Sequence, residues 1–277
     1  MSENCDHDCA SCAQHCDSRQ AAQSLQIQPN PRARVGKVIA VCSGKGGVGK
    51  SLVTAMLAAA AQKKGLRAGV LDADITGPSI PKMFGVHSRA QGDPTGVYPV
   101  CSAGGVQLMS LNLLLDHETD PVIWRGPLIT GTVRQFWTEV IWDQVDVLFV
   151  DMPPGTGDVT LTVFQSLPID GIVFVTTPQE LVWMIVQKAV KMAQLMKLPL
   201  TALVENMSYF TCPDCGKEHE IFGKSRVQET AQAFGITATA RLPLSPDIAA
   251  AADRGGIEGL GLPQLDAVLR ALDSIKK

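Results

Sequence analysis

Residues 42–51 read Cys-Ser-Gly-Lys-Gly-Gly-Val-Gly-Lys-Ser, and this stretch constrains the fold more than any other part of the chain. Gly44 is followed, after four residues, by the run Gly49-Lys50-Ser51, which is the spacing of a phosphate-binding loop. An apolar run at 38–41 precedes the loop and is typical of a buried strand, whereas the alanine-rich run at 52–61 favours a helix. Because such a loop connects a strand to a helix, these flanks predict an α/β fold built around it.

The glycines and the last two residues of the loop have different tasks. Glycines let the backbone wrap around phosphates, and the loop N–H groups together with the helix N-terminus provide positive potential there. We expect Lys50 to reach the β- and γ-phosphates and Ser51 to ligate Mg²⁺. A glycine-rich turn that binds nothing is the alternative, but the patterns on both sides favour a nucleotide site. Its expected residues are Gly44, Lys45, Gly46, Gly47, Val48, Gly49, Lys50 and Ser51.

From residue 38 onward, strand-like and helix-like patterns alternate along the chain. This alternation predicts a mostly parallel β-sheet with helices on both faces, and phosphate ligands then gather at the carboxyl ends of the strands. The short runs at 97–101 and 106–111 predict an antiparallel pair at one edge. The expected strands are 38–42, 67–72, 106–111, 145–151, 171–176, 199–205 and 238–242, and the clearest helices are 180–197, 224–234 and 262–276.

Length and composition indicate one large α/β domain at 36–277, preceded by a polar, flexible tail at 1–35. The chain has 277 residues, 45% of them hydrophobic, and a net charge of −3, which suits a single core. The near-neutral charge gives no electrostatic basis for nucleic-acid binding. No signal peptide is recognisable and no run approaches the roughly 20 apolar residues of a membrane span, so we expect a cytoplasmic protein with no membrane contact. Thiols stay reduced there, so closely spaced cysteines indicate metal or redox sites rather than disulfides.

Acidic residues follow two of the expected strands. Asp72 and Asp74 lie at the end of the second strand, where carboxylates beside a phosphate-binding loop hold Mg²⁺ waters or position the attacking water; alternatively, both cap the next turn. The strand at 145–151 ends in Asp151, a Walker B pattern that places Asp151 in the Mg²⁺ shell. The turn after it contains Gly155, whose N–H is a candidate reader of the γ-phosphate in a switch that moves. An ordinary strand-ending turn is the alternative.

A second lysine in the loop, Lys45, resembles the deviant Walker A signature of dimeric ATPases related to the septum-site, chromosome-partition and nitrogenase iron proteins. The resemblance implies that Lys45 reaches the phosphates of the partner subunit in the arginine-finger role; an exposed lysine in a polar loop is the alternative. It also implies that Asp74 is the switch I residue that orients or activates water, and that Asp72 supports the metal shell. Asn206 and Pro243 match positions where these ATPases contact adenine, although a polar cap or a loop role suits each as well.

The eight cysteines form a late pair, a tail set and two single residues: Cys212 and Cys215; Cys5, Cys9, Cys12 and Cys16; Cys42 and Cys101. A lone Cys-x-x-Cys fits half of a zinc site, here with His219 nearby, or a redox pair. Pro213 and Gly216 favour a loop over the helix start that a thioredoxin-like pair needs.

The tail set places four thiolates within twelve residues. That is the ligand count of one [4Fe–4S] cluster, and a zinc site is the alternative. His7 or His15 could then replace a cysteine as ligand. The single residues Cys42 and Cys101 are expected to be small apolar packing residues.

Three motifs taken together closely resemble the Mrp/ApbC/Nbp group of iron–sulfur cluster carrier ATPases. They are the deviant phosphate loop, the run Asp-Met-Pro-Pro-Gly-Thr-Gly-Asp at 151–158, and the block that begins Val-Glu-Asn-Met-Ser-Tyr-Phe at 204 and ends in Cys-Pro-Asp-Cys-Gly. The resemblance covers about 36–277. It implies a homodimer with slow ATP hydrolysis, whose two Cys-x-x-Cys pairs bind one [4Fe–4S] cluster for delivery to apoprotein clients. We expect two differences from many members: in place of their small N-terminal α/β domain this sequence has the cysteine tail, as Nbp-type members do but with different spacing, and Ile185 stands where they have Asp.

Two other functions compete with this one. A spatial regulator of the septum-site or partition type would have a basic amphipathic C-terminus for membrane or DNA binding. Instead, the stretch at 262–276 places leucines at helical spacing, as in a core-packed helix, and would leave the cysteines unexplained. A nitrogenase-type electron donor also bridges a cluster, but not through a late Cys-x-x-Cys.

Overall fold

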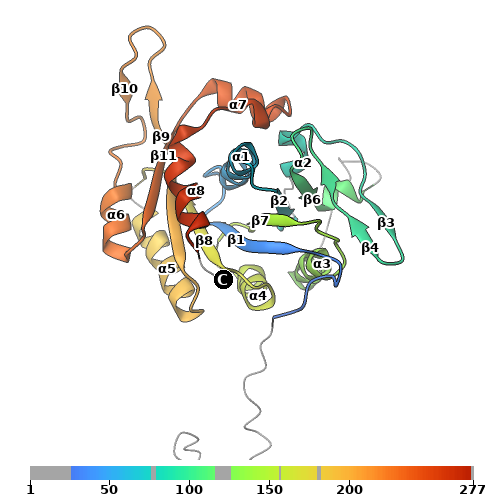
Figure 1. Ribbon diagram of the computed structural model, residues 1–277. Coiled ribbons are helices and arrows are strands. Elements are labelled where there is room, and N and C mark those ends of the chain that lie inside the picture. The colour runs from blue at the N-terminus through green and yellow to red at the C-terminus, as the bar shows by residue number, and fades with distance from the viewer. Residues whose placement is uncertain (1–25, 76–78, 116–125, 156, 180–181, 276–277) are drawn as a thin grey trace, which may run out of the picture.

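A nine-stranded sheet forms the centre of the computed structural model, which describes residues 26–75, 79–115, 126–155, 157–179 and 182–275 (Figure 1). From one edge its order is β10, β9, β8, β1, β7, β2, β6 and β5, and β11 also pairs with β9. The β5–β6 and β9–β10 pairs are antiparallel, and the other pairs of this sheet are parallel. The strands are β1 Val35–Ser43, β2 Ala68–Asp72, β5 Val100–Cys101, β6 Gln107–Met109, β7 Val145–Asp151, β8 Gly171–Thr176, β9 Leu200–Thr211, β10 Glu218–His219 and β11 Ala238–Pro243.

Helices cover both faces of the sheet (Figure 1). On one face α3, α4, α5 and α6 enclose a core that includes Trp137, Phe164 and Val190. On the other face α1, α2, α7 and α8 enclose a second core around Met56 and Leu269. The helices are α1 Lys50–Lys63, α2 Ile80–Met83, α3 Gly126–Thr138, α4 Asp158–Ser166, α5 Val182–Leu195, α6 Val227–Phe234, α7 Pro246–Asp253 and α8 Asp266–Asp273, with 3₁₀ turns η2 Leu111–Leu113, η3 Ile257–Gly259 and η4 Pro263–Leu265, and a separate hairpin of β3 Gln91–Asp93 and β4 Gly96–Tyr98.

The predicted fold class is confirmed, and each of the seven expected strands is present. The expected antiparallel edge pair is β5 with β6, where Val100 lies opposite Leu108. Two boundaries differ for physical reasons. β9 continues to Thr211, beyond the expected end at 205, because its last residues pair with β10 instead of β8. The last helix begins at Asp266, after a 3₁₀ turn that opens with Pro263.

The parallel register brings distant acidic residues to one edge of the sheet. β1 lies between β7 and β8, and β7 in turn pairs with β2. Asp72 of β2 lies directly opposite Asp151 of β7, each at the last position of its strand. β1 ends at Ser43, directly before the glycine-rich loop. The loop and both aspartates therefore share the carboxyl edge of the sheet, as the sequence predicts.

The predicted tail at 1–35 lies mostly outside the described residues, but its last part lies against the domain. The Ile27 N–H donates to the Ser166 carbonyl over 2.9 Å, and the Trp137 indole N–H donates to the Ile27 carbonyl over 2.9 Å. The Asn30 side chain also donates to the Thr95 carbonyl, over 3.1 Å. These contacts tie residues 27–30 to the domain. Across the described segments, no helix combines the length and the apolar composition that crossing a membrane requires.

Candidate functional site

Two glycines with left-handed backbone conformation and the side chain of Asn206 in β9 fix the shape of the glycine-rich loop. Gly47 and Gly49 have φ of 78° and 79°, left-handed values that side chains disfavour. The Asn206 side-chain amide donates to the Val48 carbonyl over 3.0 Å. A Cβ added at Gly49 would lie 2.3 Å from Asn206 Nδ2, so a side chain at this position is excluded by lack of space as well as by the positive φ. The loop backbone at Gly49 therefore lies close to the Asn206 amide, directly before α1 begins.

Lys50 is the buried cation of this site. Its side chain is only 5% exposed, and its Nζ lies 2.8 Å from Asp151 Oδ1 and 3.4 Å from Asp74 Oδ2. Burial alone would lower the pKa of Lys50, but the carboxylates of Asp151, Asp74 and Asp72 outweigh it and raise that pKa. The ammonium group is therefore fully charged at neutral pH, as a partner for phosphate oxygens must be.

Asp151 is held by hydroxyl groups from the first turn of α1. The Ser51 hydroxyl donates to Asp151 Oδ2 over 2.5 Å, and the Thr54 hydroxyl lies 2.8 Å from Asp151 Oδ1. Asp151 is fully buried. A serine hydroxyl and a carboxylate side by side are oxygen donors of the kind that Mg²⁺ prefers. The arrangement therefore fits the predicted metal position between Ser51 and Asp151.

Asp72 adds a second buried carboxylate to the cluster. Burial, together with the nearby charge of Asp151, raises the pKa of Asp72 to about 8, although Lys50 and a 3.0 Å hydrogen bond from the Ser110 hydroxyl oppose that rise. With Asp74 included, three carboxyl groups lie around one lysine, and the mutual repulsion that raises the pKa of Asp72 shows that negative charge is in excess there. A bound divalent cation would offset that excess, so the donor set fits Mg²⁺.

Two groups that are predicted to contact phosphates, the Lys45 ammonium and the Gly155 N–H, are hydrogen-bonded to other protein groups in this structure. Lys45 Nζ donates to the Gln179 side chain, which follows β8. The Gly155 N–H donates to the Ser43 carbonyl over 2.9 Å, and Gly155 has φ of 89°. For that N–H to contact a γ-phosphate, the bond to Ser43 must break, which requires a movement of this turn. The partner-subunit role of Lys45 and the phosphate contact of Gly155 stay predictions.

The two expected adenine residues lie on neighbouring strands at the same edge. Asn206 is buried in β9, and the half-buried Pro243 ends β11 opposite Tyr209. The Asn206 amide is engaged by the loop carbonyl of Val48. Adenine contacts by Asn206 and Pro243 stay predictions, and the structure adds a role for Asn206 in supporting the loop.

Cys212 and Cys215 lie in the turn between β9 and β10, a hairpin that projects from the domain (Figure 1). This placement confirms the expected loop. The Cys212 N–H donates to the Lys217 carbonyl and the Gly216 N–H to the Cys212 carbonyl, each over 2.9 Å. Hydrogen bonds from the backbone N–H groups of Cys215 and Asp214, and then from the Cys215 thiol, lower the pKa of Cys212. Cys215 is exposed and Cys212 half-buried, so both thiols are accessible for metal binding.

The hairpin offers two thiolates and no complete ligand set. Within the described segments, no group of three or more His, Cys, Asp or Glu side chains is placed to hold a metal ion. His219 is exposed in β10, where it pairs with Phe210 of β9. The tail residues Cys5, Cys9, Cys12 and Cys16 lie outside the described residues.

The two single cysteines differ from each other. Cys42 is buried in β1, and burial, helped by Asp151 but opposed by Lys50, raises the pKa of its thiol to about 12. This confirms its packing role. The same expectation for Cys101 is wrong, because Cys101 lies on the short edge strand β5 and is exposed. Ile185 lies in α5, and its side chain is not among the described ones.

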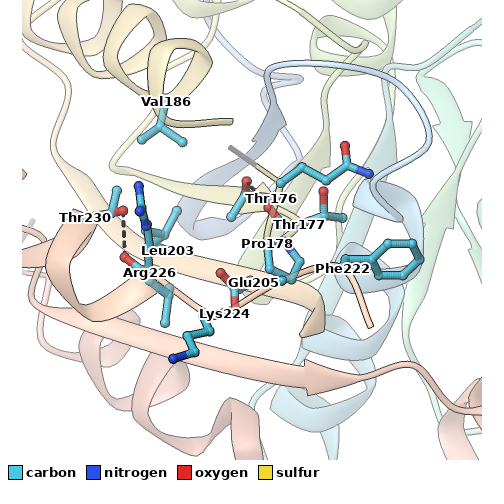
Figure 2. Close-up of a pocket in the computed structure, with 13 residues that line it drawn as sticks. Thr176, Thr177, Pro178, Val186, Leu203, Glu205, Phe222, Lys224, Arg226 and Thr230 are labelled. Carbon is cyan, nitrogen blue, oxygen red and sulfur yellow. Dashed lines mark hydrogen bonds between the residues drawn. The ribbon is translucent and has the colours of Figure 1, made fainter. Parts of the chain in front are cut away.

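A cavity of about 260 Å³ lies beside the site, between α5 and α6, next to the carboxyl end of β8 and the middle of β9 (Figure 2). Its lining includes Gln179, the partner of Lys45, and the buried Glu205 of β9. Another wall comes from Phe222 and Arg226, on the segment that returns from the cysteine hairpin. This segment therefore passes close to the end of β8 that carries the Lys45 contact.

Sequence reasoning missed three supporting residues, Thr54, Ser110 and Gln179. Thr54 had a usable signal, because it lies one helical turn after Lys50 and thus on the same side of α1. Ser110 and Gln179 follow strands β6 and β8, and only the strand order brings them to Asp72 and Lys45.

Comparison with known proteins agrees with this geometry. The family model described as NUBPL iron-transfer P-loop NTPase matches residues 34–272. The iron-sulfur cluster carrier protein of Clostridium perfringens is 42% identical over 265 residues, which cover 90% of this chain and 93% of that protein. The protein of the same name from Methanocaldococcus jannaschii is 44% identical over 237 residues, covering 85% and 81% of the two chains.

Solved structures are similar over most of the chain. The nucleotide-binding protein of Archaeoglobus fulgidus, determined in complex with ADP, superposes with a TM-score of 0.75 at 39% identity, covering 88% of this chain and 93% of that one. The MinD cell division protein of Aquifex aeolicus reaches a TM-score of 0.58 at 19% identity, covering 86% and 95%. The second likeness shows a shared fold.

Proposed function

Because the chain belongs to the NUBPL iron-transfer P-loop NTPase family, we propose that it binds and slowly hydrolyses ATP and that, as a homodimer, it carries [4Fe–4S] clusters to apoprotein clients. The observation that carries the proposal is the placement of two motifs in one domain. A complete phosphate loop with its acidic cluster occupies the carboxyl edge of the sheet, and an accessible cysteine pair projects from β9 at the same edge. Neither a spatial regulator nor an electron donor of the nitrogenase type accounts for that pair.

The nucleotide half of the proposal assigns one task to each side chain. Lys50 binds the β- and γ-phosphates, and Ser51 and Asp151 hold Mg²⁺ with support from Asp72. Asp74 lies beside Lys50 and orients the attacking water. Lys45 acts on the phosphates of the partner subunit, where it stabilises charge that develops in the transition state.

The cluster half of the proposal follows from a ligand count. A [4Fe–4S] cluster takes four thiolates, and the hairpin provides two, from Cys212 and Cys215. A two-fold axis supplies the other two from the same residues of a second copy. A cluster bridged in this way lies at the subunit boundary, where it remains accessible for transfer to an apoprotein. The tail cysteines are proposed to hold a second metal centre.

Anaerobic reconstitution of the full chain and of a Cys212→Ser/Cys215→Ser variant tests the proposal. We expect the parent to show the absorption and spin-resonance spectra of a [4Fe–4S] cluster and to activate an apoprotein, whereas the variant should bind ATP normally but transfer no cluster. Cys101→Ser is the matched control, since it removes an exposed thiol on the opposite edge of the sheet. Transfer by the double variant at the parental rate would move the carrier function to the tail.

A further inference from the structure

One arginine joins the cysteine hairpin to the sheet. Arg241 Nη2 lies 3.1 Å from Glu220 Oε1, and Glu220 immediately follows the returning strand β10. Arg241 Nε donates to the Ser208 hydroxyl over 2.8 Å, and its guanidinium carbon lies 5.4 Å from the centre of the Tyr209 ring. Arg241 itself belongs to β11. A single guanidinium group therefore contacts both the outgoing strand and the returning segment of the hairpin.

The same contacts continue towards the phosphate loop. The Ser208 hydroxyl, which accepts from Arg241, donates to Glu205 Oε1 over 2.6 Å. Glu205 is only 3% exposed and lies opposite Arg241 in the β9–β11 register. Its neighbour along β9, Asn206, donates to the Val48 carbonyl of the loop. An unbroken series of hydrogen bonds and one backbone step therefore runs from the loop to Glu220.

The phosphate loop and β9 are closely packed where they meet at Asn206. The Asn206 amide is bonded to the Val48 carbonyl, and it is so close to Gly49 that a Cβ there would lie 2.3 Å from it, so a displacement of the loop backbone toward β9 would push Asn206. Met207, the next residue, has φ of 53°, a left-handed conformation that is uncommon outside glycine. β9 is therefore irregular between the loop contact and the hairpin, and its register with β11 shifts between Arg241 and Pro243. Ser208, which Arg241 holds, is the next residue after this irregularity.

We propose that Arg241 is a positioning residue that clamps the cysteine hairpin to the end of β9 and thereby couples nucleotide binding at the phosphate loop to the conformation of Cys212 and Cys215. This inference rests on the proposed function and extends it, because it names the contacts through which the two sites communicate. Arginine suits the task, since its planar fork makes several directed contacts at once. A methionine at this position would keep the length of the side chain and lose those polar contacts.

The test compares the full-length parent with Arg241→Met and Glu220→Ala. The first measurement is the rate of amide hydrogen exchange in residues 209–219, with and without Mg-ADP. The second is the rate of cluster transfer to an apoprotein, with and without Mg-ATP. In the parent we expect nucleotide to change both rates by about fivefold or more, the lower end of typical coupling between sites. In both variants the change should fall below about twofold, while the Kd for Mg-ADP stays close to that of the parent.

Arg67→Met is the matched control, because Arg67 also makes a two-point ion pair, with Asp146, but beside the amino ends of β2 and β7. It should keep the full nucleotide effect. Glu220→Ala removes a half-exposed acceptor and leaves Arg241 in place, so it tests the clamp even if Arg241→Met folds poorly. Retention of the nucleotide effect by Glu220→Ala would overturn the inference. A parent that binds Mg-ADP with no change in hairpin exchange would overturn it as well. A parent that binds neither Mg-ADP nor a cluster would instead refute the proposed function.

Discussion

Replacement of Thr54 by valine tests how the acidic cluster is held together. The Thr54 hydroxyl lies 2.8 Å from Asp151 Oδ1 and 3.0 Å from the Lys50 carbonyl, and the residue is fully buried. Valine has nearly the same shape, so the substitution removes the hydroxyl without opening a cavity. Hydrogen bonds to charged groups contribute about 1.5–3 kcal/mol, so we expect the free energy of unfolding to fall by about that amount.

The cost should be large because Asp151 is inaccessible to water, which cannot replace the lost donor. Urea unfolding of the nucleotide-free protein measures the change, and an unchanged slope with denaturant shows that stability alone has changed. Thr132→Val in α3 is the matched control. The Thr132 hydroxyl donates to the backbone, at the Leu128 carbonyl over 3.1 Å, and we expect a loss below about 1 kcal/mol.

The loss of stability in Thr54→Val should be accompanied by weaker binding of Mg-ADP. A less firmly held Asp151 is a poorer Mg²⁺ partner, so Thr54→Val should weaken Mg-ADP binding while Thr132→Val leaves it unchanged. Calorimetric titration measures both affinities. If Thr54→Val unfolds with the same free energy as Thr132→Val and binds Mg-ADP as the parent does, the hydroxyl does not support Asp151 and our account of the cluster is wrong.

Four further outcomes are expected. Lys50→Ala should abolish nucleotide binding in a titration, because the phosphates lose their buried cation; binding equal to that of the parent would refute the phosphate-loop assignment. Lys45→Ala should bind ATP but lose turnover, with Lys64→Ala, a surface lysine paired with Asp266, as control; unchanged hydrolysis would exclude an action in the partner's site. Asp74→Asn should also bind ATP without hydrolysing it, and a normal kcat would remove its water-positioning role. Deletion of residues 1–25 spares the contacts of Ile27 and should lower the iron and sulfide content of the reconstituted protein; unchanged content would argue against a tail cluster, and a loss of zinc instead would identify the alternative metal.

The sequence alone was sufficient for features that local patterns encode. Glycine spacing and the apolar runs around Lys50 identify the loop, because wrapping a phosphate requires flexible backbone between a strand and a helix. The Pro213 and Gly216 signals around the cysteine pair correctly predicted a turn, since proline fixes φ for a turn and Gly216 adopts a φ of 68° that favours glycine. The expectation for Cys101 failed because it rested on residue type alone, whereas Cys101 lies in a run that was itself predicted at a sheet edge, where a side chain stays exposed.

Tertiary structure decided how these features are connected. Ser51 meets Asp151 across 100 residues of sequence, and Asn206 meets Val48 across 158, because parallel strands far apart in the chain end at the same edge of the sheet. Which strands become neighbours depends on packing over the whole sheet, and no local pattern states it. The hydrogen bonds from the phosphate loop through β9 to Arg241 and the hairpin follow from that strand order. The sequence therefore determined which chemical groups this protein possesses, and the fold determined which of them act together.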